Sequence, residues 1–238
     1  MIIKRLPAFL AVIFSIITIP AFADTIPQTR YFSGIPNIPN GTSTFNQFDD
    51  NGDTWVLQSI QISFTLESSG GRLILDNDND YAVSGIFEFG SKGDISPTTD
   101  VILKDSSSNP IPGQADAYHS EPFSLAANLG DGVGDYSPVS PDGLLYNGKI
   151  ETSIKSGFVG SDFWTAGTNG FLGTGTYDID YSIIRWADHN GSGQIEYAIT
   201  PVNVNGLLTV VYTYDVVPEP ATIILLALGT FTFLRKKK

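Results

Sequence analysis

The chain has 238 residues and no cysteine, and its 25 acidic and 13 basic residues give a formal net charge of −12. The lack of cysteine excludes disulfide bonds, thiol nucleophiles, cysteine-ligated zinc and iron–sulfur clusters. Residues 24–220 hold all 25 acidic residues and only seven basic ones, a net charge of −18, so this region is expected to repel nucleic acid.

The first segment, residues 1–23, has the order of a secretory signal peptide. The basic pair Lys4-Arg5 precedes an apolar run over residues 6–19, and Ala21 and Ala23 form an A-x-A cleavage site. This order predicts export and removal of the segment by signal peptidase after Ala23. The alternative is an uncleaved membrane anchor.

Alternation of apolar and polar residues dominates the region that follows. Residues 60–66, 176–183 and 207–214 alternate with a period of two, which is typical of strands with one buried face. Shorter strand candidates occupy residues 71–76, 83–89, 101–104, 150–154 and 195–199. We therefore expect residues 24–217 to form one all-β domain, an antiparallel β-sandwich of jelly-roll or immunoglobulin-like type with long loops.

Residues 105–145 are the least regular part of this domain. Residues 109–113 and 130–135 are rich in Gly, Pro, Asn and Asp, which favour loops. The segment is therefore predicted to form long loops on the sandwich, with one helical turn at residues 124–129.

Residues 188–196 resemble the front of a calcium-binding loop. Asp188, Asn190 and Ser192 place side-chain oxygens at positions 1, 3 and 5, and Glu196 is a candidate for a further oxygen ligand. Position 12 is Ile199 instead of glutamate, so the site is expected to be weak. The alternative is a glycine-rich turn between two strands.

Two other turns are rich in carboxylates. Asp76, Asp78 and Asp80 alternate with asparagines, and a similar run covers residues 49–53. Calcium takes six to eight hard oxygen ligands, and such turns supply several of them. Polar hairpin turns have the same composition, so both interpretations stay open.

The sequence offers little for catalysis. It contains two histidines, His119 and His189, and neither a G-x-S-x-G nor an H-E-x-x-H motif. No catalytic residue is therefore predicted, and the protein is expected not to be an enzyme.

Three tryptophans, Trp55, Trp164 and Trp186, are candidates for stacking on sugar rings. Aromatic residues of a β-sandwich also fill its core. The glycines around residues 158–164 favour exposure of Phe163 or Trp164 on a loop.

The last 21 residues, 218–238, form a distinct tail. Pro218, Glu219 and Pro220 precede an uncharged apolar run over residues 221–234, and the chain ends in four cations, Arg235, Lys236, Lys237 and Lys238. As a helix the run would rise about 21 Å, short of the about 30 Å of a hydrocarbon core, so it would insert marginally as a transmembrane helix with the cations on the cytoplasmic side. The alternative is a final core strand.

This tail resembles the PEP-CTERM sorting signal of exported bacterial proteins, in the tripeptide Pro218-Glu219-Pro220, the apolar segment and the basic end. The resemblance implies processing by exosortase, a membrane enzyme of bacteria that make exopolysaccharide. The match covers about a tenth of the chain.

The body of the chain is similar to the choice-of-anchor E domain family. The similarity lies in residues 30–36, in Thr44-Phe45-Asn46-Gln47-Phe48-Asp49, in the strand at residues 57–66 and in the aromatic strand at residues 206–214. It implies a surface protein and supplies no catalytic residues.

These observations predict an exported, non-enzymatic protein of the cell surface or of the exopolysaccharide matrix of a biofilm. Its expected partners are signal peptidase, exosortase, the membrane before processing, and exopolysaccharide; no nucleic acid and no obligatory cofactor are expected. The alternative is a surface module that binds carbohydrate or calcium, and a third interpretation is a secreted hydrolase.

Overall fold

The structure, a computed structural model, describes residues 23–36, 41–97, 102–128, 130, 136–139, 141–167 and 170–217. The described chain is all-β, with one short 3₁₀ helix (Ser161–Phe163) and no α-helix among these residues. Its strands are β1 (Ala23–Gly34), β2 (Gly41–Asn46), β3 (Trp55–Ser69), β4 (Arg72–Asn77), β5 (Val83–Pro97), β6 (Leu103–Lys104), β7 (Gln114–Leu125), β8 (Gly143–Asn147), β9 (Glu151–Val159), β10 (Thr176–His189), β11 (Ile195–Thr200) and β12 (Asn203–Val216).

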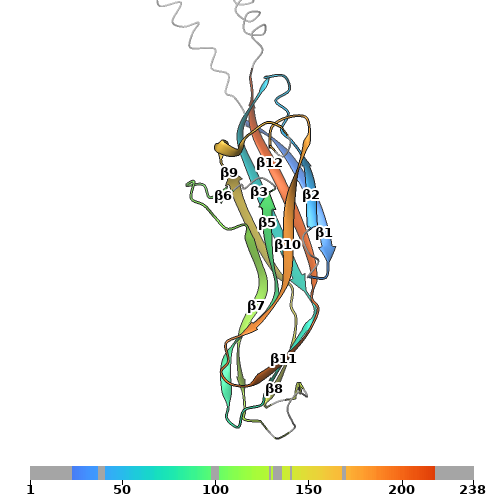
Figure 1. Cartoon of the computed structure of the whole chain (residues 1–238), viewed down its shortest axis with the longest axis vertical. Coiled ribbons are helices and arrows are strands. Elements are labelled where there is room, and N and C mark those ends of the chain that lie inside the picture. Colours follow the sequence, from blue (N-terminus) through green and yellow to red (C-terminus); the bar gives the residue numbers. More distant parts are fainter. Residues whose placement is uncertain are drawn as a thin grey trace, which may run out of the picture.

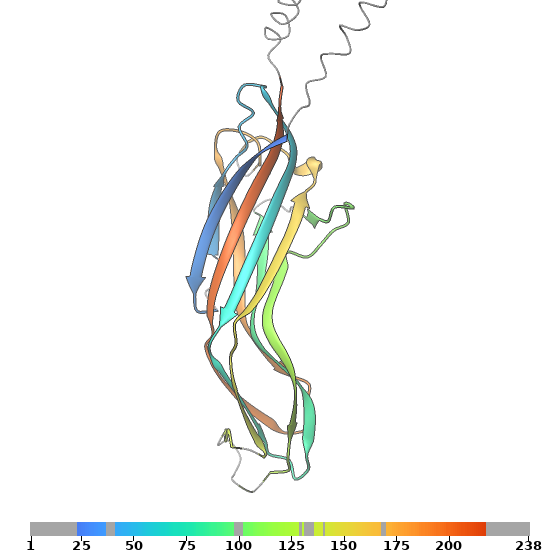
Figure 2. The same cartoon turned by 180° about the vertical axis from the view of Figure 1, so that it is seen from behind.

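The strands form three antiparallel sheets. A five-stranded sheet has the order β1-β12-β3-β9-β6, and a four-stranded sheet has the order β2-β10-β5-β7. These two sheets face each other as two layers (Figure 1), and the view from behind shows the five-stranded layer in front (Figure 2). A three-stranded sheet, β11-β4-β8, lies at the end remote from the start of β1 and the end of β12 (Figure 1).

The core lies between the two layers. The alternating residues of β3, Ile60, Ile62, Phe64 and Leu66, are all fully buried, which follows from the period-two geometry of a strand with one inward face. Their counterparts from the four-stranded layer are buried aromatic and branched residues, among them Phe87, Phe89, Tyr177 and Ile179. Removal of this apolar surface from water stabilises the fold.

Side chains join the two layers along their edges. Gln28 on β1 donates from Nε2 to the carbonyl of Asn46 at 2.9 Å, and the amide of Asn46 donates to Gln28 Oε1 at 2.8 Å. Arg30 Nε donates to the carbonyl of Thr44 at 2.8 Å. On the opposite side the amide of Asp116 donates to Ser153 Oγ at 3.1 Å. These bonds satisfy strand edges that would otherwise be open for pairing.

The two ends of the described chain lie side by side. Ala23 pairs with Asp215 in the antiparallel ladder of β1 and β12. The amide of Val217 donates to the carbonyl of Thr54 at 2.8 Å, so the chain is held to the domain up to its last described residue. Both ends therefore leave from the same end of the molecule (Figure 1).

The prediction of an all-β chain with antiparallel sheets is confirmed, and the long alternating segments lie in β3, β10 and β12. The prediction of loops throughout residues 105–145 is wrong, because β7 lies within that segment and β8 begins in it. The helical turn at residues 124–129 is also wrong for its described part, since Ser124 and Leu125 end β7 and pair with β5.

The physical reason for the missed strand β7 is its composition. Its inward face begins with Ala115 and Ala117, which are both buried but too small to produce a clear apolar pattern. Pairing with β5 along its whole length, from Val83↔Leu125 to Asp94↔Gln114, makes it a strand. Tertiary contacts therefore outweighed its weak local preference.

The two sorting segments fall outside the described residues. This applies to the signal peptide up to residue 22, including Ala21, and to the whole tail, residues 218–238, with its expected transmembrane helix. Within the described part of the chain there is no helix with the length and apolar character needed to cross a membrane. Ala23, the last residue before the predicted cleavage, is the first residue of β1.

Candidate functional site

Three carboxylates from two separately predicted calcium segments meet in the three-stranded sheet. Antiparallel pairing of β4 with β11 places Glu196 opposite Asp76, and Asp78 follows directly after β4. One oxygen from each of Asp76, Asp78 and Glu196 lies within 4.8 Å of the others. Side-chain oxygens at this spacing are suited to a divalent hard cation.

The cluster is partly withdrawn from water. Asp76 is 1% exposed, and its Oδ2 accepts a hydrogen bond of 2.7 Å from the amide of Ser137. Glu196 Oε2 is buried and has no hydrogen-bond partner among the described residues. A buried carboxylate oxygen without a donor is costly, and a bound cation would offset that cost.

An asparagine network holds the turn that carries Asp78. Asn79 donates to Asn77 Oδ1 from its amide at 3.1 Å and from Nδ2 at 2.7 Å. Its own Oδ1 accepts from the amide of Gln194 at 2.9 Å. Both asparagines are buried, so these bonds fix the turn after β4 against the start of β11.

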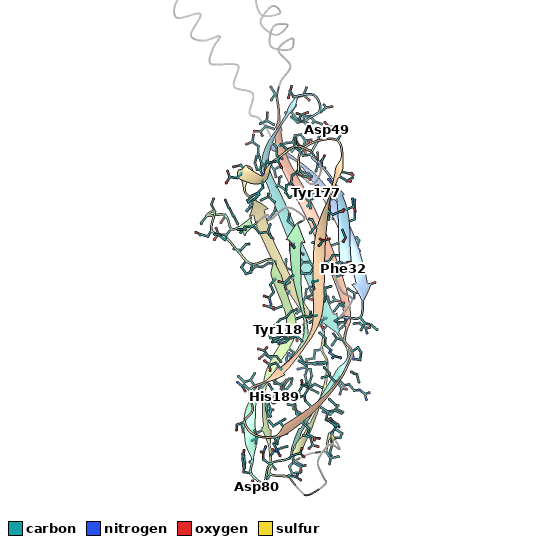
Figure 3. All side chains as sticks on the ribbon, viewed as in Figure 1. Phe32, Asp49, Asp80, Tyr118, Tyr177 and His189 are labelled. Carbon is teal, nitrogen blue, oxygen red and sulfur yellow. The ribbon has the colours of Figure 1, made fainter. Side chains whose placement is uncertain are left out.

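The other predicted calcium ligands lie elsewhere. Asp188 Oδ1 accepts from the amide of His189 at 2.8 Å, and Asn190 Oδ1 accepts from the amide of Ile86 at 2.7 Å. Ser192 and Asp80 are exposed, and Figure 3 places Asp80 at the tip of the molecule. Asn190 thus directs its oxygen to β5, whereas Glu196 lies opposite Asp76 of β4. Binding of one ion by residues 188–196 stays a prediction.

The turn at residues 49–53 is explained by its own hydrogen bonds. The amide of Asn51 donates to Asp49 Oδ1 at 2.9 Å, and the amide of Gly52 donates to Asp50 Oδ1 at 3.1 Å. Asn51 and Asp53 adopt φ values of 52° and 64°, which asparagine and aspartate tolerate better than most residues. These features support the interpretation of a polar turn.

His119 belongs to a charge network at the junction of β7 and β9. Its Nε2 lies 2.9 Å from Glu121 Oε2, and its Nδ1 lies 2.9 Å from Glu151 Oε1. Its ring stacks on Tyr146 with centroids 5.2 Å apart. Hydrogen bonding to His119 and the charge of Lys149 lower the pKa of Glu121. Since both ring nitrogens face carboxylates, neither is placed to activate a hydroxyl nucleophile.

The three tryptophans have different surroundings. Trp164 packs against the core, and its Nε1 donates to the carbonyl of Val159 at 3.2 Å. Trp186 donates from Nε1 to Glu88 Oε2 at 2.7 Å, and Lys92 Nζ lies 3.1 Å from its ring centroid. The expectation that Phe163 or Trp164 is exposed on a loop is wrong, because both pack against the core. Trp55 also packs against the core, and it lines a cavity.

The comparisons with known proteins identify the tail. Residues 216–238 match the model of the PEP-CTERM protein-sorting motif. This motif indicates an exported protein that is sorted by exosortase and whose precursor is anchored in the membrane. No curated protein matches the chain.

Among solved structures, the chain is similar to structures of infectious bursal disease virus and of particles derived from it. The structure of its Gx strain shows 11% identity and a TM-score of 0.15 over 86% of this chain and 43% of the viral chain. The T=1 particle derived from that virus shows 12% identity and a TM-score of 0.15 over 85% and 41%. The chain thus spans less than half of these viral chains, and scores this low carry no argument about fold or function.

Proposed function

We propose that this chain is a non-enzymatic protein of the cell surface or exopolysaccharide matrix, delivered there by exosortase processing of its tail. The observation that carries the proposal is the PEP-CTERM motif at residues 216–238. We interpret the two layers as a β-sandwich and the body as a choice-of-anchor E domain, on residues 30–36 and 44–49. Exopolysaccharide is the partner that these features favour.

The placement of the chain ends supports this proposal. β1 begins and β12 ends at the same end of the molecule, while the three-stranded sheet lies at the other end (Figure 1). A domain held by its C-terminal tail would therefore extend away from the membrane. Its surface charge favours solubility outside the cell.

The sorting proposal is tested by Glu219→Ala in a host that contains exosortase. Residues 221–234 are unchanged in this variant, so insertion of the apolar segment is retained. We expect processing to fail and a larger form to remain in the membrane, as seen by immunoblotting of cell fractions.

The matched control replaces Arg235, Lys236, Lys237 and Lys238 with neutral residues. This change is expected to disturb membrane retention, because the positive charges orient and hold the segment. Normal size and location of Glu219→Ala would show that the tail is only an anchor.

We also propose calcium binding by Asp76, Asp78 and Glu196. The observation that favours it is the convergence of two segments, 120 residues apart in sequence, each of which carries oxygen ligands in a calcium-loop pattern. The buried Oε2 of Glu196, which has no partner among the described residues, supports it. Calcium at such a site would fasten β4 to β11.

The calcium proposal is tested by thermal unfolding in chelator and in millimolar calcium. Binding to the folded state alone adds about 1.4 kcal/mol of stability at a calcium concentration tenfold above Kd, so the melting temperature should rise. Glu196→Gln should abolish this rise and the control Asp80→Asn should preserve it. An unchanged melting temperature of the unaltered protein would refute calcium binding.

A further inference from the structure

A cavity of about 470 Å³ lies at the opposite end of the molecule from the acidic cluster. Its walls come from β1, from the end of β2 and the segment that follows it, from the start of β3, from the loop before β10 and from β12. They include Gln28, Asn46, Phe48, Asp49, Trp55 and Thr174. Asp49 marks this end in Figure 3. The volume falls within the range of about 300–1,000 Å³ that small-molecule sites occupy.

Trp55 supplies the aromatic wall of this cavity. Its ring packs on Tyr214 with centroids 4.7 Å apart and lies 6.4 Å from the ring of Phe48. Phe48 is 3% exposed, whereas Trp55 is only half-buried. No described residue accepts a hydrogen bond from Trp55 Nε1, which distinguishes it from Trp164 and Trp186. The cavity is therefore lined by a partly exposed indole whose N–H bonds to no described residue.

The rim of the cavity is fixed in advance. Gln28 and Asn46 exchange two hydrogen bonds, as described above. Gln47 Nε2 donates to the carbonyls of Gly167 and Gly170, both at 2.7 Å, while its Oε1 accepts from the amide of Gly175 at 3.0 Å. A rim held by such bonds loses little conformational entropy when a ligand binds.

The polar groups that remain on the rim suit hydroxyl groups. One oxygen of Asp49 accepts from Asn51, and its other oxygen has no partner among the described residues. The hydroxyl of Thr174 likewise has no partner there, and both residues are exposed. The residues that line the cavity thus include a carboxylate acceptor, a hydroxyl group and an indole.

We propose that this cavity binds one neutral hexose unit of a polysaccharide. The apolar C–H face of the sugar lies on Trp55, and its hydroxyl groups bond to Trp55 Nε1, Asp49 and Thr174. The carboxylate of Asp49 and the net charge of −18 over residues 24–220 repel uronate-bearing polymers. This proposal deepens and rests on the proposed matrix role, because it names the contact between the domain and the polysaccharide.

The test is affinity electrophoresis of the full chain in detergent through gels that contain a neutral glucan, galactan or mannan, or alginate as the anionic polymer. We expect at least one neutral polymer to retard the protein and alginate to have no effect. Trp55→Ala should weaken binding about tenfold, and Thr174→Ala should weaken it several-fold. Trp164→Ala is the matched control and should bind as the unaltered protein does.

Trp55→Ala also removes packing on Tyr214, so it changes the stability of the fold as well as the cavity. Thr174 is exposed, so Thr174→Ala tests binding without this loss of packing. No retardation of the unaltered protein by any of the three neutral polymers would overturn the proposal. Retardation by alginate, or unchanged binding of both Trp55→Ala and Thr174→Ala, would also overturn it. These outcomes are independent of tail processing, which Glu219→Ala reports, so failure of the cavity and failure of sorting are distinguishable.

Discussion

Asp94 and Asp116 illustrate how the acidic surface costs stability at the scale of single residues. The two side chains lie on neighbouring strands, β5 and β7, and partial burial together with the charge of Asp116 raises the pKa of Asp94. A carboxyl group whose pKa is higher in the folded state binds its proton more tightly there. Its ionisation therefore lowers the free energy of unfolding as the pH rises.

We predict that Asp94→Asn raises the melting temperature at pH 7. The gain should vanish below about pH 4, where the carboxyl group is protonated in both states. Thermal unfolding followed by circular dichroism at both pH values measures this difference. A variant less stable than the unaltered protein at pH 7 would contradict the prediction.

Asp105→Asn is the control for Asp94→Asn, because the expected change in melting temperature at pH 7 has the opposite sign. The amide of Asn109 donates to Asp105 Oδ1 at 2.9 Å, Asn109 Nδ2 donates to Oδ2 at 3.1 Å, and the amide of Ser107 donates to Oδ1 at 2.8 Å; these bonds lower the pKa of Asp105. Its contribution to stability is present at neutral pH and is lost as the pH falls through the lowered pKa. Asp105→Asn should therefore lower the melting temperature at pH 7.

At the scale of elements, an aromatic stack beside β1 joins the two layers by packing rings from both of them together. The ring of Phe32 from β1 lies 4.3 Å from the ring of Tyr181 on β10, and it also contacts Phe64. Gly206 on β12 is paired with Phe32 and leaves room for its ring, because a Cβ atom there would overlap it. The stack thus depends on a glycine in the neighbouring strand.

We predict that Gly206→Ala lowers the free energy of unfolding by about 1–3 kcal/mol, because Phe32 must leave its position over Tyr181. Urea unfolding measures the change, and the exposed neighbour Ser33→Ala serves as the control. A change within about 0.5 kcal/mol, as is usual for surface substitutions, would show that Phe32 shifts without cost.

At the scale of the whole molecule, the folded domain and the sorting motif are adjacent in the chain. Val217 is still hydrogen-bonded to Thr54, and Pro218 follows it directly. The precursor therefore presents its Pro-Glu-Pro motif to a membrane enzyme with a folded domain directly before it.

We predict that a six-residue Gly/Ser spacer between Val217 and Pro218, about 13 Å in mean reach, speeds conversion of the precursor by relieving this crowding. Pulse-chase labelling in a host with exosortase measures the rate. The same spacer between the exposed residues Ser106 and Ser107 should leave the rate unchanged. Slower conversion with the spacer at Val217 would mean that the domain helps to position the motif.

The sequence by itself determined the properties that local patterns encode. Alternation at residues 60–66, 176–183 and 207–214 predicted long strands, because one-sided burial leaves a period of two in any strand. The sorting tail was also readable, since Pro218, Glu219 and Pro220 act as a linear motif in fixed order with an apolar run and cations.

Only the tertiary structure decided which distant residues meet. Ala115 and Ala117 carry too little apolar surface to reveal β7, which forms because β5 lies beside it. Glu196 joins Asp76 through the pairing of β11 with β4, and the surroundings of Trp55 come from segments far apart in the chain. Strand pairing between distant segments is set by the packing of the whole core, and no local period records it.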